Sequence, residues 1–281
     1  MAERNLTVIP VGGLANRMLA MTSAYELARD TQRSLTVIWQ KDAGLNASFF
    51  DLFTPLNEPI KIVSKDSLIF SLYYEIPRKK NLYVPKILHK LSRGVWIQHL
   101  SSETASLNEE FFLEKALQPV KNISVTSCYP FYDKETAGDL KKIFHPSDKV
   151  EKRIDKILSG KKPDIALQIR RTDNQWSIDH SPTFMFEEIV RREIAKNPDI
   201  IIYLATDDQD TKFLFKENFS RNIIFNPSKA NRDTFEGMID GAAEMFIMAK
   251  CHTIYGSFSS TYSYVASLLG DACLEVVKLG N

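Results

Sequence analysis

The chain has 281 residues, which is enough for one large domain or for two domains of about 130 residues each. Its 36 lysines and arginines nearly balance its 35 aspartates and glutamates, so the formal net charge of +1 gives no general reason to expect a nucleic-acid partner. The three cysteines are widely spaced and form no CxxC pair, which argues against a zinc site and against a disulfide framework.

The amino-terminal residues run directly into a strand-like segment at 6–10, without the basic and apolar regions of a signal peptide. No apolar run approaches the roughly 20 residues that a membrane-spanning helix needs. We therefore expect a cytoplasmic protein. A basic stretch at residues 78–93 is interleaved with apolar side chains and could contact the inner membrane face or a lipid-linked acceptor, although a solvated loop or helix face is the simpler interpretation.

Short β-branched runs alternate with longer helical patterns from the start of the chain. Residues 6–10, 15–30 and 35–39 predict a strand, a helix and a second strand. This alternation indicates a parallel sheet. Residues 60–128 are less regular, and only 123–128 stand out there as a further strand.

The second half repeats the same rhythm after a charged, helical stretch at 139–162, in which Pro146 marks a break. We place the domain boundary in this stretch and divide the chain into an amino-terminal α/β lobe, residues 1–150, and a Rossmann-like lobe, residues 151–281. The strands predicted in the second lobe are at 164–169, 200–205, 222–226 and 253–255, and the helices are at 183–196, 210–218, 233–249 and 260–269. Tandem α/β units predict a ligand cleft outside the carboxyl ends of their strands.

The first candidate motif joins the first strand to the first helix. Gly12 and Gly13 permit a tight turn there, and the helix that contains Asn16 and Arg17 offers backbone N–H groups to an anion or a sugar oxygen. The GxGxxG spacing of a dinucleotide site is missing. A purely structural turn explains the motif as well as a binding site does.

The second motif is an arginine pair, Arg170 and Arg171, at the end of a predicted strand. Arginine is planar and permanently charged, so it suits a diphosphate that becomes a leaving group. Adjacent strand residues point to opposite faces, so we expect one arginine to meet phosphate and the other to brace the loop. The alternative is a surface ion-pair cluster with Asp173 and Asp179.

The third motif is an acidic segment, Asp207 to Asp210, between a strand and a helix. Asp208 and Asp210 have the DxD form in which two carboxylates can share a divalent metal ion. An aspartate at this point is also well placed to cap the helix, and we favour that interpretation over a metal site.

The fourth motif is a Gly/Ser-rich turn, residues 256–260, between a short strand and a helix. Its hydroxyl groups and the following helix N-terminus form a natural seat for phosphate.

Together these segments resemble the GDP-fucose-dependent fucosyltransferase superfamily, especially the α1,6-fucosyltransferases and the bacterial nodulation enzymes, with bacterial α1,2-fucosyltransferases as further relatives. Residues 170–173 are similar to the family's RRTD, residues 203–208 to its YLATDD, and residues 257–260 to its final FSS segment. Residues 13–21 and 31–35 resemble its opening helix and following strand.

The resemblance implies a GT-B-type α/β fold, with two Rossmann-like lobes, parallel sheets and an inter-lobe cleft. It implies that the lobe at 151–281 binds the nucleotide sugar and that the lobe at 1–150 is the acceptor side. It also implies an inverting glycosyltransferase that moves fucose from GDP-fucose to an oligosaccharide or glycoconjugate hydroxyl without an obligatory metal, for example in polysaccharide biosynthesis. The donor-binding residues so expected are Gly12, Gly13, Asn16, Arg17, Arg170, Arg171, Asp173, Asp207, Asp208, Ser257, Ser259 and Ser260.

The sequence departs from the family pattern around the reacting centre. Gln168 replaces the usual histidine, and the glutamate expected as base is missing, with Asp179 one residue beyond its place. The catalytic candidates are therefore Arg170 for the leaving group, with Asp179 as the first candidate base and Asp240 as the second. A different nucleotide sugar, or GDP binding without transfer, are the alternatives, and an NAD-dependent oxidoreductase is a poorer fit.

Overall fold

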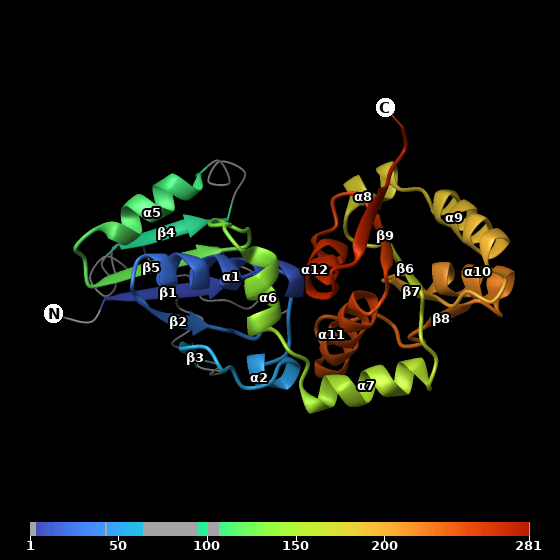
Figure 1. Ribbon diagram of the computed structural model, residues 1–281, viewed down its shortest axis with the longest axis horizontal. Helices are drawn as coiled ribbons and strands as arrows, with labels where there is room; N and C mark the ends of the chain where they lie inside the picture. The colour runs from blue at the N-terminus through green and yellow to red at the C-terminus, as the bar shows by residue number, and fades with distance from the viewer. Residues whose placement is uncertain (1–3, 43, 64–94, 101–106, 281) are drawn as a thin grey trace. The chain divides into compact units, whose positions relative to one another are not determined.

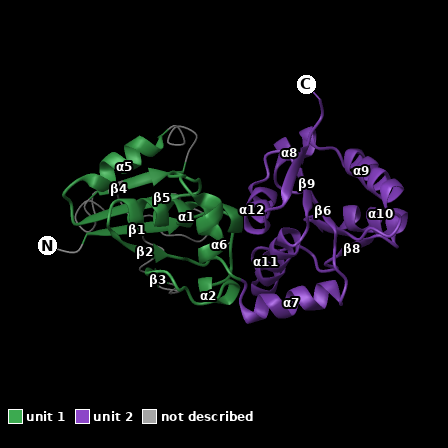
Figure 2. Ribbon diagram, viewed as in Figure 1, with its two compact units in different colours: residues 1–145 green, residues 146–281 purple. Residues whose placement is uncertain are grey.

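The computed structural model describes residues 4–42, 44–63, 95–100 and 107–280 (Figure 1). The chain divides into two compact units, residues 1–145 and 146–281, each with a five-stranded parallel sheet (Figure 2). The predicted α/β fold with two parallel sheets is confirmed. The basic stretch at 78–93 lies outside the described residues. Within the ranges given above, no helix is both long enough and apolar enough to cross a membrane.

The sheet of the first unit has the strand order β3-β2-β1-β5-β4. Its strands are β1 (Asn5–Pro10), β2 (Ser34–Ile38), β3 (Ile60–Val63), β4 (Val95–His99) and β5 (Asn122–Ser127), and its helices are α1 (Leu14–Asp30), α2 (Phe49–Leu52), α5 (Glu109–Leu117) and α6 (Thr136–Ile143). The central strand β1 pairs with β2 through Leu6 and Leu35, and with β5 through Leu6 and Ile123. Helix α1 packs on β1 and β2 and also contacts α5 and α6, which explains why it is buried almost all round.

The sheet of the second unit has the order β10-β9-β6-β7-β8. Its elements are α7 (Asp148–Leu158), β6 (Ile165–Ile169), α8 (Gln175–His180), α9 (Thr183–Lys196), β7 (Ile202–Thr206), α10 (Gln209–Phe219), β8 (Ile223–Phe225), α11 (Phe235–Ala249), β9 (Thr253–Ser257), α12 (Thr261–Gly270) and β10 (Cys273–Val277). Strands β6 and β7 are buried along their whole length, as expected for strands covered on both faces.

Helices on the two faces of this second sheet belong to different parts of the chain. Helices α9 and α10 pack on β6, β7 and β8, whereas α11 and α12 pack on β7, β9 and β10 from the other face (Figure 1). The chain therefore adds strands in one direction from β6 to β8, and then returns to add β9 and β10 on the opposite side of β6. The loops that follow β6 and β9 lead to opposite faces, and such a switch point is where open α/β sheets bind ligands.

Most predicted elements are observed within two residues of their expected ends. In the first unit, however, α2, β3, β4 and α5 were not predicted, and in the second unit α8 and β10 were missed. Helix α8 has only six residues, too few to show a helical period, and β10 is a largely exposed edge strand that contains Glu275. The helical stretch predicted at 139–162 is broken around Pro146, where α6 has ended and Ser147 caps α7 by accepting a hydrogen bond from the Val150 N–H.

We expect Gly270→Ala to destabilise the second unit. An added Cβ at this last residue of α12 would lie 1.7 Å from the Ala249 carbonyl oxygen at the end of α11, so the two helices would have to separate. Overpacking of this kind costs about 1–3 kcal/mol, measurable by urea denaturation. Gly241→Ala is the matched control, because its Cβ would meet nothing within 4 Å inside α11. That change should stabilise by about 0.5–1 kcal/mol. Equal stability of both variants would contradict the packing argument.

Candidate functional site

The carboxyl ends of β6, β7 and β9 are tied together by side chains from the predicted motifs. The Ser257 hydroxyl accepts a hydrogen bond from the Arg170 N–H at 3.1 Å and donates to the Gln168 carbonyl at 3.1 Å. On the other side, the Asp207 carboxylate accepts from the Arg171 N–H and the Thr172 hydroxyl, both at 2.7 Å. The loop after β6 is therefore fixed by both neighbouring strands.

Two arginines from different loops share one carboxylate at this edge. Arg170 contacts Asp173 Oδ1 through Nε at 2.8 Å and Nη2 at 2.7 Å, and Arg232 Nη2 lies 3.0 Å from Asp173 Oδ2. Burial alone would raise the pKa of Asp173, but the guanidinium groups of Arg232 and Arg170 hold it below its usual value. The arrangement presents two permanent cations side by side, partly exposed to solvent.

Arg171 is placed differently from its neighbour. Its guanidinium donates to the Thr183 hydroxyl at 2.9 Å, to the Arg170 carbonyl at 2.7 Å and to the Ser181 carbonyl. These contacts brace the loop between β6 and α9. Arg170 is thus the member of the pair that is better placed to meet a ligand.

Asp208 caps helix α10. Its carboxylate accepts from the Thr211 N–H at 2.8 Å and from the Thr211 hydroxyl at 2.6 Å. This is the capping role favoured for the acidic motif. Among the described residues, no group of three or more His, Cys, Asp or Glu side chains is arranged to hold a metal ion.

The Ser-rich turn after β9 leads into the N-terminus of α12. Ser259 has a left-handed backbone, with φ of 58°, and its carbonyl accepts from Asn174 Nδ2 at 3.5 Å. Ser260 occupies the N-cap position, yet its side chain makes no capping bond, and within the described part of the chain its buried hydroxyl has no hydrogen-bond partner. A hydroxyl in this state at a helix N-terminus can bind an oxyanion.

Helices α10 and α11 carry further charged side chains, of which the sequence singled out only Asp240. Burial raises the pKa of Glu244 to about 8, against the opposing effect of the Lys212 ammonium. Lys212 is itself buried and donates to the Ser228 carbonyl at 2.6 Å. Asp240, the second candidate base, pairs with Arg153 of α7, as does Glu236.

Arg232 and Glu244 were both missed by sequence analysis, for different reasons. Arg232 lies in a polar loop with no strand or helix pattern to place it. Glu244 could have been noticed as the one charged side chain in the apolar run from Gly241 to Ala249.

Asp179, the first candidate base, lies on the exposed side of α8. Its carboxylate accepts a hydrogen bond from Gln175 Nε2 at 2.7 Å. Helix α8 follows Asp173 closely, because Asn174 caps it by accepting from the Ser177 N–H at 3.2 Å. Asp179 therefore lies on the helix that directly follows the loop of Arg170 and Asp173.

The glycine motif of the first unit lies at the carboxyl end of β1, next to that of β5. Gly12 has a φ of 92°, and an added Cβ there would meet Asn16 and Cys128 at 3.4–3.6 Å. Gly13 caps α1, and an added Cβ would meet nothing within 4 Å. The positive φ therefore favours glycine at position 12, whereas position 13 has room for a side chain.

Arg17 was expected to bind the donor, but the structure places it inside the first unit. Its side chain is 0% exposed, donates to the carbonyls of Gly12 and Gln40, and pairs with Asp42 at 2.8 Å. It holds the glycine turn against the loop after β2. Its role in this structure is support of the turn, in place of direct ligand contact.

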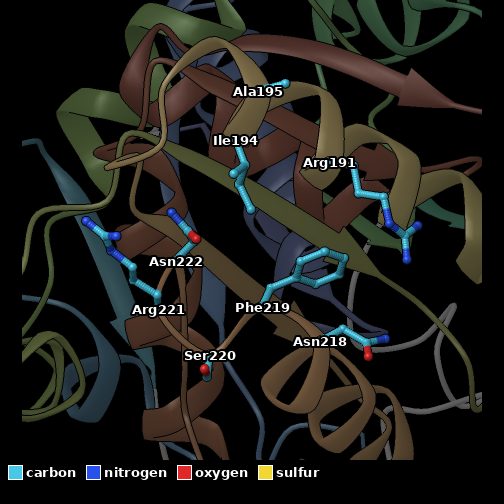
Figure 3. Close-up of a pocket in the computed structure, with 8 residues that line it drawn as sticks. All are labelled: Arg191, Ile194, Ala195, Asn218, Phe219, Ser220, Arg221 and Asn222. Carbon is cyan, nitrogen blue, oxygen red and sulfur yellow. The ribbon is translucent and has the colours of Figure 1, made fainter.

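A separate cavity of about 440 Å³ lies at the other edge of the second sheet, near the C-terminal ends of α9 and α10 (Figure 3). Its arginines, Arg191 and Arg221, pair with Glu187 and Asp199. Asn222 donates to the carbonyls of Pro198 and Ile200. These polar groups stabilise the turn before β8, and the cavity shares no residue with the predicted motifs.

Replacing Arg17 by methionine should destabilise the protein strongly. The change leaves Asp42 buried without its cation, and breaking such a pair costs about 3–5 kcal/mol. The midpoint of thermal unfolding measures the loss. Lys134→Met is the control, because the Lys134–Glu109 pair is exposed and should contribute little. An unchanged midpoint in the Arg17 variant would contradict the supporting role.

Glu244 should make stability fall as the pH rises through neutrality. The folded protein keeps the proton on this carboxyl up to a pKa of about 8, whereas its ordinary value is 4.5. Between these values the folded state binds more protons than the unfolded chain, so the free energy of unfolding decreases with rising pH. Glu244→Gln should flatten this dependence between the two pKa values, from about pH 4.5 to about pH 8. Glu236→Gln, which changes a largely exposed carboxylate on the same helix, should keep the wild-type slope.

Comparison with known proteins finds likeness at the level of structure. No protein-family model and no curated protein sequence matches the chain. The NodZ α1,6-fucosyltransferase soaked with GDP-fucose has a TM-score of 0.67 at 17% identity, over 95% of this chain and 92% of that one. A mutant of Arabidopsis thaliana FUT1 in complex with GDP has 0.65 at 15% identity, over 99% and 71%.

A third structure, POFUT1 in complex with GDP, has a TM-score of 0.63 at 12% identity over 99% of this chain and 100% of that chain. Identities this low establish the fold alone. The expected GT-B-type α/β fold is confirmed, and the resemblance to GDP-fucose-dependent fucosyltransferases holds at the level of the fold.

Proposed function

We propose that the protein is an inverting glycosyltransferase that transfers fucose from GDP-fucose to a glycan hydroxyl. The observation that carries the proposal is the pair of cations at the switch point, where Arg170 and Arg232 share Asp173. Solved structures with this fold include complexes with GDP and GDP-fucose. A nucleotide diphosphate is the ligand class that such a pair would hold best.

In this proposal the diphosphate lies between the arginines and the N-terminus of α12. Asp173 keeps the two guanidinium groups oriented before the donor arrives. Arg170 and Arg232 then neutralise the charge that develops on GDP as the sugar leaves, while the Ser260 hydroxyl and the helix N-terminus bind further phosphate oxygens. Positioned arginines fill the leaving-group role that a metal ion has in other transferases.

The acceptor hydroxyl would attack the anomeric carbon from the side opposite GDP, with inversion. Asp179 is the better candidate to take the hydroxyl proton, because its carboxylate is exposed beside the arginine loop. Asp240 is 7% exposed and engaged with Arg153, so it suits a supporting role. We assign the donor site to the second unit.

A transferase for another nucleotide sugar remains the nearest alternative. Arginines and serines recognise the diphosphate and not the hexose, so the same residues would serve a different donor. A GDP-binding protein without transfer is the other alternative, favoured by the replacement of the family histidine by Gln168. Turnover of GDP-fucose, GDP-mannose and UDP-sugars, followed as nucleotide release, separates these cases.

Calorimetric titration of GDP in the presence of EDTA tests the proposal. We expect metal-independent binding of GDP, with weaker binding of UDP and none of NAD. Arg170→Ala and Arg232→Ala should each weaken GDP binding about tenfold to a hundredfold, because each removes a charge-assisted contact. Arg221→Ala removes a cation at the far edge of the same unit and should leave the affinity unchanged. Absence of GDP binding, or binding indifferent to Arg170, would disprove the donor site.

A further inference from the structure

Helix α8 carries an exposed aromatic cluster next to the arginine site. The ring of Trp176 lies 4.2 Å from that of His180, and His180 stacks on Phe258 at 5.0 Å with 25° between the planes. Trp176 is 58% exposed, an unusual state for the largest apolar side chain. Phe258 directly follows Ser257, so the cluster joins α8 to the loop after β9.

The cluster is held in one arrangement by backbone contacts. The Ser181 hydroxyl accepts from the Phe258 N–H at 2.8 Å, and the Ser177 hydroxyl donates to the Phe258 carbonyl at 2.6 Å. His180 Nδ1 donates to the Trp176 carbonyl at 2.9 Å, which fixes the imidazole ring. The exposed indole therefore sits on a rigid base and costs little conformational entropy to use.

Hydrogen-bonding groups flank the indole on the same helix. Gln175 and Asp179 are both exposed, and their side chains are joined at 2.7 Å. Asp179 lies three residues after Trp176, so the two side chains are neighbours on the helix surface. The outward side of α8 thus combines one flat apolar surface with an amide and a carboxylate.

A pyranose ring has the complementary chemistry. Its C–H groups form an apolar face that packs on the electron-rich face of an aromatic ring, and its hydroxyls at the rim bond to amides and carboxylates. We propose that the outward face of α8 binds a sugar ring of the acceptor, with Trp176 under the ring and Gln175 and Asp179 at its hydroxyls. This inference rests on the proposed transferase function and adds the site of acceptor recognition.

Continuity with the donor site favours an acceptor sugar as the occupant. Asn174 joins the start of α8 to the Ser259 carbonyl, and Phe258 lies one residue from the serine that binds the Arg170 backbone. A sugar stacked on Trp176 presents its hydroxyls to Asp179, the candidate base. The aromatic surface and the diphosphate site would then hold the two substrates on adjacent loops.

Binding to a glycan microarray in the presence of saturating GDP tests this subsite. We expect the wild type to bind a subset of glycans, and Trp176→Ala to lose about tenfold in apparent affinity for them, as for loss of a stacked ring. Trp176→Phe keeps an aromatic face and should retain most of the binding. Phe213→Ala, which removes another highly exposed ring on α10, should behave as wild type. Calorimetry should show the same GDP affinity in all four proteins.

The outcomes separate this inference from the proposed function. Glycan binding that is equal in the wild type and in Trp176→Ala would overturn the subsite, and so would a wild type that binds GDP but no glycan. Trp176-dependent binding to anionic lipid vesicles without glycan binding would also overturn it, in favour of a membrane contact. Failure to bind GDP would refute the donor proposal, while Trp176-dependent glycan binding would still support the subsite.

Discussion

The reversal of strand order at β6 is the constraint on which the second unit depends. Because β7 and β9 lie on either side of β6 and lead to helices on opposite faces, the loops after β6 and β9 diverge at the carboxyl edge. The Ser257 hydroxyl fastens these loops together by bonding to both Gln168 and Arg170. Every residue of the proposed donor site is attached to this edge, including the cap of α12 and the start of α8.

Arginine serves two physical purposes in this protein, and the partners of the guanidinium group distinguish them. Arg17 and Arg171 bond to backbone carbonyls and shape turns, so their charge is used internally. Arg170 and Arg232 share a single carboxylate and remain partly exposed, which leaves net positive charge at the surface. Asp173 has a central part in this balance. It prevents two neighbouring cations from repelling each other, while a diphosphate with greater charge can still compete for them.

The proposed donor and acceptor contacts meet on one short helix. Helix α8 starts beside Asp173 and carries both Trp176 and Asp179, so a change in this helix would affect sugar recognition and proton transfer together. Its six residues could not stand alone as a helix. It is held by the Asn174 cap and by Ser177 and Ser181, which bond to Phe258 of the neighbouring loop.

The sequence by itself determined the alternation of strands and helices, the parallel sheets, and the positions of Arg170, Asp207 and the serine turn, because hydrophobic periodicity and local motifs record them directly. Tertiary structure decided which polar groups meet. Arg232 joins Asp173 across 58 intervening residues, and Glu244 becomes a neutral acid only when the packing of α11 on the sheet removes its carboxyl group from water. The partners of a charge and the burial that sets its pKa are long-range properties, which one-dimensional patterns do not contain.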